Sequence, residues 1–281
     1  MSLLATPKAN TQTKKRRVMN PAFKVMKYGF FDLLRSRWIL IYSLFFMAVT
    51  GGLLYFAGDP NQAVLSTLNL VLLVIPLVSL VLGLSYSYYS RDFLALILTQ
   101  PIARSGVFLG HYAGIALPLL ASFLLGSGLP FAIFALRNEA DLAVIVGLLS
   151  AGSFVTLIFS ALAFWIALVV EERVRALGLA LGLWLLLTML YDGLLLMFII
   201  LMQAYPIERA LIGLSVLNPI DLSRILVLLQ LDTAALMGYT GAVFQRFFGS
   251  GWGISISLVS LSLWTIVPIL LALRAFQRKN F

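Results

Sequence analysis

Six long apolar stretches divide this sequence, and each one is long enough to cross a membrane as a helix. A helix rises about 1.5 Å per residue and the hydrocarbon core of a bilayer is about 30 Å thick, so roughly twenty apolar residues are needed. The stretches are Trp38–Phe56, Leu68–Tyr88, Val107–Leu136, Leu142–Val170, Ala176–Met202 and Trp252–Phe276. With 61% hydrophobic and 11% charged residues, the chain is far more apolar than a soluble domain. We therefore predict an all-α integral membrane protein with six transmembrane helices.

The basic residues are distributed unevenly between the two sides of these spans. Nine precede the first span, two lie in residues 89–106, two in residues 171–175 and three near the C-terminus, whereas the other three loops carry none, one and three. By the positive-inside rule, both termini are predicted to be cytoplasmic. The net charge of +9 is then explained by attraction to anionic lipids, so we predict membrane lipids rather than nucleic acid as partners.

The segment before the first span has two parts. Residues 1–20 are polar and basic, and we predict a disordered cytoplasmic tail. From Pro21 onward, apolar residues recur at helical spacing on one face, and polar residues occupy the other face. This pattern predicts a helix lying flat in the cytoplasmic interface, either as a simple anchor or as an elbow that transmits force into the first span. The apolar face comprises Phe23, Met26, Phe30, Leu33 and Leu34, and the polar face Lys24, Tyr28, Asp32, Arg35 and Ser36.

A short apolar helix is predicted between spans two and three. Ser90 is placed to cap it, Asp92 lies in its first turn, and Pro101 ends it. About ten residues are too few to span the bilayer, yet the segment is too apolar to stand alone in water. It therefore either packs under the bundle or docks into another protein, and Arg104 beyond it is placed to meet an acidic partner surface. The loop Glu171–Arg175 is predicted to be a solvated connection, close to any such partner.

The segment from Gln203 to Gly251 is predicted to lie on, or dip into, the outer interface. Asn218 has the position of a helix cap, with Pro219 at the first helical position and Asp221 two residues later; Arg224 follows one turn on, placed for an ion pair. A second amphipathic helix is expected over Thr233–Phe248, followed by a flexible glycine-rich lead into span six. These elements are placed to cover an exit path or to seat an extracytoplasmic partner.

Asp192, which follows Tyr191, is the only acid well inside an apolar span. Two interpretations stay open. An intramembrane carboxylate normally faces a cavity or a partner and marks a functional site. Alternatively, Asp192-Gly193 marks a break in the helix, and the carboxylate caps the following half-helix.

Several kinds of chemistry lack the residues that they require. The chain has one histidine and no cysteine, so a membrane zinc protease is excluded and no metal site is expected. His111 is expected to be solvated at the interface, and the methionines near Asp192 are expected to pack rather than conduct copper. No glycine-rich phosphate loop precedes a lysine, so another polypeptide or an ion gradient must power any active transport. We predict a transport subunit, not an enzyme, that binds no cofactor itself.

The predicted arrangement resembles the permeases of type-2 ABC exporters. It comprises an interfacial helix, six spans, a short cytoplasmic helix after span two and short helices before span six. The resemblance covers residues 21–281, which we predict to form one permease domain. Four motifs are more specifically similar to the NosY family, the permeases of nitrous-oxide-reductase maturation transporters. They are Arg91-Asp92-Phe93 with Gln100-Pro101-Ile-Ala-Arg104, Leu190-Tyr-Asp-Gly193, Leu217-Asn-Pro-Ile-Asp-Leu-Ser-Arg224 and Ala235-Leu-Met-Gly-Tyr-Thr-Gly241. Where many NosY proteins carry acids and glycines, this chain has Ser90-Arg91-Asp92.

The resemblance implies a homodimer in a bacterial cytoplasmic membrane and a role in copper–sulfur centre assembly during denitrification. It implies a NosF-like cytoplasmic ATPase, which holds ATP and Mg²⁺, and a NosD-like periplasmic β-helix protein. Alternatives are an exporter of lipid or drug-like cargo and a membrane scaffold without transport. The residues implied to contact the ATPase are Ser90, Arg91, Asp92, Phe93, Gln100, Pro101 and Arg104.

Overall fold

The computed structural model of the chain describes residues 21–56, 60–100, 102–137, 141–202, 208–231 and 239–279, and almost all of these residues are helical. The predicted all-α fold is therefore confirmed. Residues 1–20, Pro101 and residues 233–238, for which a tail, a helix stop and the start of an amphipathic helix were predicted, lie outside the described residues.

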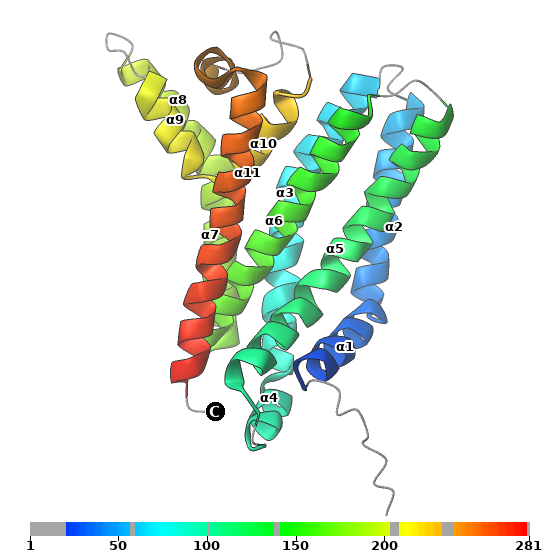
Figure 1. Cartoon of the computed structure of the whole chain (residues 1–281), viewed down its shortest axis with the longest axis vertical. Coiled ribbons are helices and arrows are strands. Elements are labelled where there is room, and N and C mark those ends of the chain that lie inside the picture. Colours follow the sequence, from blue (N-terminus) through cyan, green and yellow to red (C-terminus); the bar gives the residue numbers. More distant parts are fainter. Residues whose placement is uncertain are drawn as a thin grey trace, which may run out of the picture.

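Six helices in the described part of the chain are long and apolar enough to cross a membrane, as predicted. They run side by side in one bundle (Figure 1). One of the six, from Arg173 to Leu201, continues through a turn of π-helix without a break. The spanning helices are α2 (Arg37–Phe56), α3 (Pro60–Tyr89), α5 (Arg104–Arg137), α6 (Leu142–Val169), α7 (Arg173–Leu185) with η1 (Leu186–Leu190) and α8 (Tyr191–Leu201), and α11 (Tyr239–Arg278).

Helix α6 forms the centre of the bundle and is the most buried span. It packs against α3, α5 and α11. Small residues make this possible: a side chain at Gly152 would collide with the ring of Phe123, which is fully buried. Close approach through small residues is the usual way in which membrane helices pack, because burial from water does not drive them together.

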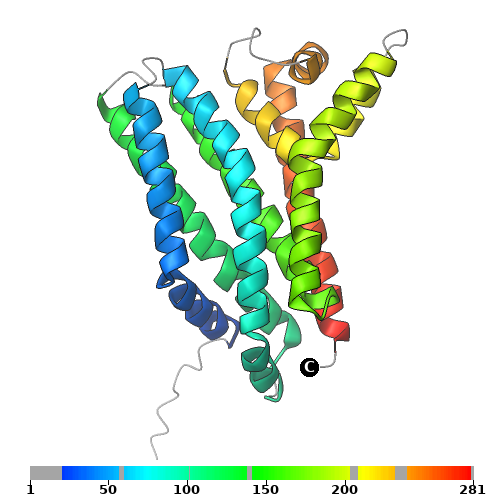
Figure 2. The same ribbon diagram turned by 180° about the vertical axis from the view of Figure 1, so that it is seen from behind.

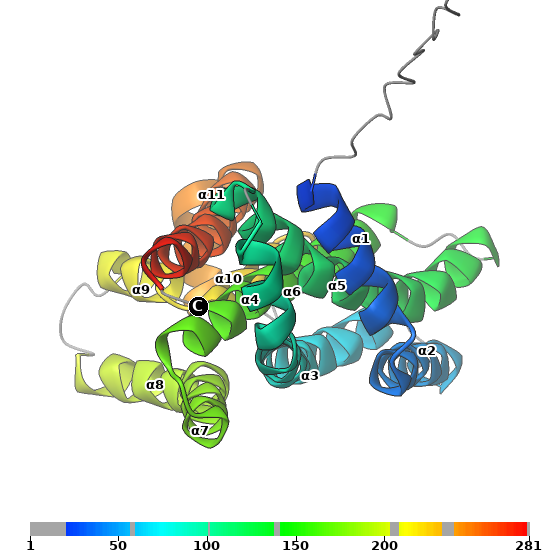
Figure 3. The same ribbon diagram turned by 90° about the horizontal axis from the view of Figure 1, so that it is seen from below.

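Helix α1 (Pro21–Leu34) lies across one end of the bundle, beneath α5 (Figure 3). The contact is a close approach of two backbones: a Cβ added at Gly29 would lie 3.3 Å from the Cα of Gly114. A Cβ added at Gly110, one turn earlier in α5, would collide with the carbonyl oxygen of Ala22. The buried face of α1 therefore differs from the predicted apolar face: Val25, Gly29 and Leu33 are buried, whereas Phe23 is half exposed.

Three short helices occupy the two ends of the bundle. Helix α4 (Arg91–Leu98) lies at the same end as α1 and the C-terminus, here called the α4 end (Figures 1 and 2). Helices α9 (Glu208–Val216) and α10 (Pro219–Leu228) lie at the opposite end and meet at a bend of 108°. All of α10 except Arg224 is buried. Helix α10 is therefore packed within the protein, and its predicted position on or in the outer membrane interface stays a prediction.

The predicted flexible lead into span six is wrong. Helix α11 begins at Tyr239 and continues through Gly249-Ser-Gly-Trp-Gly253 without interruption. Gly253 serves close packing instead, because a Cβ there would lie 2.7 Å from Cδ1 of Leu229, at the end of α10.

Candidate functional site

Arg91 begins α4, and its side chain turns inward to the C-terminal end of α6. Its guanidinium donates hydrogen bonds to the carbonyl oxygens of Ala167 (2.7 Å), Val170 (3.0 Å) and Glu171 (3.0 Å), and its Cζ lies 3.9 Å from the centre of the Tyr88 ring. The last carbonyls of a helix have no partner within it, and a planar guanidinium with five donors can satisfy several of them. Arg91 therefore ties the start of α4 to the end of α6.

A second cation reinforces this end of α6. The Nζ of Lys279 donates a hydrogen bond to the carbonyl oxygen of Leu168, at 2.8 Å. Burial and the neighbouring charge of Arg91 lower the pKa of Lys279, while Glu171 acts in the opposite direction. Positive charge at a helix C-terminus is also favoured by the helix dipole.

Arg104 makes a similar connection at the other end of the α4 segment. Its Nη1 donates to the carbonyl oxygens of Gln277 (3.1 Å) and Lys279 (3.4 Å), at the end of α11. The predicted role of Arg104 was contact with an acidic partner. The structure gives its guanidinium partners within the chain, so the segment from Arg91 to Arg104 is attached to α6 at its start and to α11 at its end.

Ser90 does not cap α4 through its side chain, contrary to the prediction. Its hydroxyl instead donates to the carbonyl oxygen of Tyr86, one turn back in α3, at 2.8 Å, and lies 3.1 Å from Nε2 of His111. His111 is 2% exposed and packs between the rings of Tyr86 and Phe164. The expectation that His111 is solvated is therefore wrong: the ring is a buried contact between α3, α5 and α6.

The outward surface of α4 is smaller than the set of residues predicted to meet an ATPase. Phe93 is half buried and stacks on Tyr28 of α1, with ring centres 5.1 Å apart. Asp92 and Gln100 are exposed, and so is Leu96, at 70%. Leu96 was absent from the predicted site. The helical spacing in the sequence could have indicated its exposure, because Leu96 lies four residues after Asp92 and so shares its helical face.

A second polar group joins α8 to α10 near the opposite end. Nη1 of Arg224 lies 3.1 Å from Oδ2 of Asp192 and 3.3 Å from Oδ1 of Asp221. The predicted pair between Asp221 and Arg224 is thus confirmed. Asp192 is its third member, and since the helix runs unbroken from α7 through η1 into α8, the interpretation of Asp192 as the cap of a half-helix is wrong.

Asn218 joins the same region to the π-helical turn. Its side chain accepts a hydrogen bond from the backbone nitrogen of Ile220 (3.0 Å), which is the predicted cap, and donates one to the carbonyl oxygen of Leu187 in η1 (3.0 Å). The hydroxyl of Tyr191 donates to the carbonyl oxygen of Leu214 in α9. A π-helical turn leaves backbone groups without regular partners, and such turns are frequent at functional sites. The buried start of α10 is therefore joined to η1 by the Asn218 amide, and α10 is joined to α8 by the three-membered charge cluster.

Within the described residues, no three His, Asp or Glu side chains are placed to hold a metal ion. The two polar assemblies consist of cations on carbonyl oxygens and of an arginine between two carboxylates. Both assemblies link helices to one another through hydrogen bonds and ion pairs.

The structure is thus a bundle with six candidate membrane spans, in which the segment from Arg91 to Arg104 is hydrogen-bonded to the ends of α6 and α11. The sequence profile of the ABC-2 family transporter proteins matches residues 91–281, and the chain belongs to this family. It is a multi-pass permease subunit of an ABC transporter.

Two relatives place the chain more narrowly, and both are called probable ABC transporter permease protein NosY. The protein of Pseudomonas aeruginosa is 32% identical over 264 residues, which cover 88% of this chain and 94% of the relative. The protein of Stutzerimonas stutzeri is 29% identical over 283 residues, which cover 93% of this chain and 99% of the relative. The predicted resemblance is confirmed.

Proposed function

We propose that this chain is the permease of a transporter that serves assembly of the copper–sulfur centre of nitrous oxide reductase. The proposal is supported by its similarity to NosY proteins over nearly the whole of both chains. The cargo is copper, a sulfur species or a conformational signal. The alternatives, an exporter of lipid or drug-like cargo and a scaffold without transport, are outcomes of the experiments below.

The α4 end is assigned to the cytoplasm of a bacterial inner membrane, and both termini with it. The charge distribution supports this assignment, because α1 with its basic residues, α4 and the last turn of α11 all lie at that end. The opposite end, with α9 and α10, then faces the periplasm and a NosD-like partner. Asn218, Asp221 and Arg224 hold α10 in place there, as a gate or a seat for that partner.

In this mechanism a NosF-like ATPase, with its ATP and Mg²⁺, grips the outward face of α4. ATP-driven closure displaces α4, and the displacement passes through Arg91 to α6 and through Arg104 to α11. The observation that carries the proposal is this double attachment of one short segment to two spans. The spans then move between two packed arrangements as rigid bodies.

A second copy of the chain completes the transporter. The span from Arg173 to Leu201 supports this, because it is the least buried of the six. Side chains added at Gly178 and Gly182, one turn apart in α7, would meet open space. Small residues on a free helical face are suited to close packing against another helix.

Leu96→Asp tests the assigned ATPase contact. Because Leu96 is 70% exposed, the substitution leaves the fold unchanged, whereas a charge placed in an apolar contact opposes docking. We expect co-purification of the ATPase chain to fall at least tenfold, and elution of the permease itself to be unchanged. Leu136→Asp is the matched control, since Leu136 is an exposed leucine in the last turn of α5, whose C-terminal end lies away from α4. Unchanged ATPase capture by Leu96→Asp would disprove the contact.

The biological role is tested in cells that lack this chain. We expect nitrous oxide reductase purified from them to be deficient in copper, and the wild-type chain, but not Leu96→Asp, to restore the metal content. A fully loaded reductase in the absence of the chain would refute the proposed role. Co-purification of the chain with an ATPase but with no periplasmic β-helix protein would instead favour an exporter of other cargo. Absence of any coupled ATPase activity would favour a scaffold without transport.

A further inference from the structure

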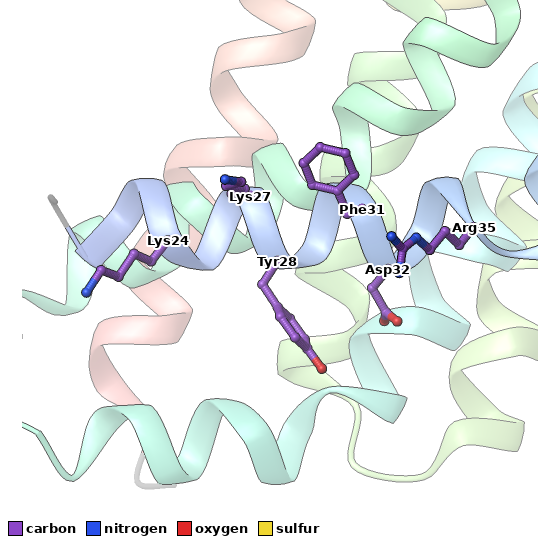
Figure 4. Close-up of a pocket in the computed structure, with 6 residues that line it drawn as sticks. All are labelled: Lys24, Lys27, Tyr28, Phe31, Asp32 and Arg35. Carbon is purple, nitrogen blue, oxygen red and sulfur yellow. The ribbon is translucent and has the colours of Figure 1, made fainter.

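A polar hollow on α1 leads into an apolar groove on the membrane-facing side of the bundle. The hollow has a volume of about 500 Å³, and Figure 4 shows its lining side chains along the length of α1. An adjoining hollow of about 430 Å³ shares Asp32 and Arg35 with it. That second hollow shares Trp38 and Leu82 with a groove of about 380 Å³ between α2 and α3. The three spaces therefore neighbour one another in this order, and together they are called the path below; Arg35 lines both of its polar hollows.

The polar part of this path is cationic. Lys24, Lys27 and Arg35 are exposed, and within the described part of the chain none of them makes an ion pair. Asp32 is the one acid in the lining, and it lines the adjoining hollow together with Tyr86. An anion entering the hollow thus meets three exposed cations and one carboxylate.

The far part of the path is apolar. The nine residues that line the groove between α2 and α3 carry no charge, and they include Ile41, Val78 and Val81. Trp38 stands at the transition from polar to apolar lining and is 67% exposed. Tryptophan is enriched at this depth in membrane proteins, where its ring bridges the headgroup and hydrocarbon regions.

One class of ligand fits this spatial order, in which a cationic hollow is followed by an interfacial tryptophan and then by an apolar groove. A free anion would use only the cationic hollow, and a water-soluble protein would not reach the groove at hydrocarbon depth. A phospholipid with a net negative charge uses both parts, because its phosphate and its acyl chain are joined in this order. Arginine is also the side chain best suited to a phosphate, through paired N–H donors.

We propose that this surface binds an anionic phospholipid, with its phosphate on Arg35 and an acyl chain in the groove between α2 and α3. Lys24 and Lys27 supply further attraction for the headgroup. The bound lipid joins α1, α2 and α3 on the side of α1 away from its glycine contact with α5. This site is independent of the cargo and of the identity of the ATPase.

The test measures lipid retained by the purified full-length chain. The chain is incubated in detergent with equal amounts of dioleoyl phosphatidylglycerol and dioleoyl phosphatidylcholine, and retained lipid is counted by native mass spectrometry. We expect phosphatidylglycerol to be preferred at least fivefold, and Lys27→Gln with Arg35→Gln to abolish that preference. The matched control is Arg274→Gln with Arg278→Gln, which removes the same charge from exposed positions near the C-terminal end of α11. An equal loss of preference in the control would overturn the site, since only overall charge would then matter.

The acyl-chain part has its own variant. Val81→Trp fills the groove, and we expect it to lower retention of both lipids at least threefold while helical content and elution stay unchanged. Should Val81→Trp fail to fold, Ile41→Trp fills the groove from an exposed position. Unchanged retention in a folded groove-filling variant, or displacement of phosphatidylglycerol by millimolar inorganic phosphate, would reduce the site to a simple anion contact and overturn the proposal.

Discussion

At the scale of single residues, the chain uses arginines to join elements that are distant in sequence. Arg91 and Arg104 reach the carbonyl ends of α6 and α11, and Arg224 joins α10 to α8. The carbonyl oxygens of Ala167 and Val170 and the two carboxylates around Arg224 are partly buried, where a missing partner is costly, whereas the acceptors of Arg104 are exposed. The arginine positions therefore determine which helices are joined to one another.

Arg91→Gln is expected to uncouple the ATPase without releasing it. Hydrogen bonds to charged groups are worth about 1.5–3 kcal/mol. The carbonyls of Ala167 and Glu171 lose the guanidinium donor, while that of Val170 keeps the Tyr88 hydroxyl, so we expect the free energy of unfolding to fall by about 2 kcal/mol. Arg91→Lys should be intermediate, because an ammonium group keeps the charge but not the planar fork. Thermal unfolding and permease-stimulated ATPase activity measure the two effects. Loss of ATPase capture in Arg91→Gln would mean that Arg91 touches the ATPase directly.

Substitutions of the three residues in the charge cluster of Asp192, Asp221 and Arg224 are expected to lower the free energy of unfolding by different amounts. Asp192→Asn leaves Arg224 paired with Asp221, so we expect a loss of about 1 kcal/mol, whereas Arg224→Gln leaves two carboxylates without a cation and should cost about 3 kcal/mol. The double variant Arg224→Gln with Asp192→Asn should recover part of that loss. Thermal unfolding of all four proteins forms a double-mutant cycle. Additive effects would contradict a direct interaction.

At the scale of elements, the contact between α1 and α5 depends on the absence of side chains. Gly106, Gly110 and Gly114 recur every fourth residue in α5, so they form one groove that receives α1. This spacing is a familiar signal of helix packing in membranes, and it could have indicated that α1 lies against α5 rather than only on the lipid surface. The same contact places Tyr28 against Phe93, so α1 and α4 share one surface.

Gly110→Val is expected to displace α1, because a Cβ at this position collides with the backbone of Ala22. The chain has no cysteine, so Tyr28→Cys with Phe93→Cys provides a clean pair for a short bis-thiol cross-linker. We expect the cross-linking yield to fall roughly fivefold on the Gly110→Val background. Gly51→Val is the control, since a Cβ at Gly51 meets open space. Equal yields on both backgrounds would exclude the tight contact.

At the scale of the whole molecule, the two ends of the bundle have different structures. The α4 end carries a short helix attached to two spans and the cationic face of α1, whereas the other end carries the buried helix α10 and its charge cluster (Figure 1). In the proposed function, the ATPase applies force at the α4 end, and the structural change follows at the end with α9 and α10. The orientation of the bundle therefore decides whether this mechanism holds.

Single cysteines test the orientation directly. Thr99 directly follows α4, Leu136 lies in the last turn of α5, and both are exposed. Because these two helix ends lie at opposite ends of the bundle, Thr99→Cys should react with a membrane-impermeant maleimide only after the cells are opened, and Leu136→Cys in intact spheroplasts. The cysteine-free wild type gives no background. Labelling of Thr99→Cys in intact spheroplasts would reverse the orientation and exclude a cytoplasmic ATPase at α4.

The number and approximate bounds of the spans, the ion pair within α10 and its cap could all be predicted from the sequence alone. Each depends on neighbouring residues: a span needs a continuous apolar stretch, and residues three or four apart in a helix are neighbours by geometry. Only the tertiary structure decided that Ser90 turns back to α3, that His111 is buried, that Arg91 ends on α6 and that Asp192 meets Arg224. Apart from the bond of Ser90 to Tyr86 one turn away, these contacts join residues far apart in sequence. The partners of Ser90 in α3 and of Arg91 in α6 are backbone carbonyls, which every residue carries and no sequence pattern distinguishes.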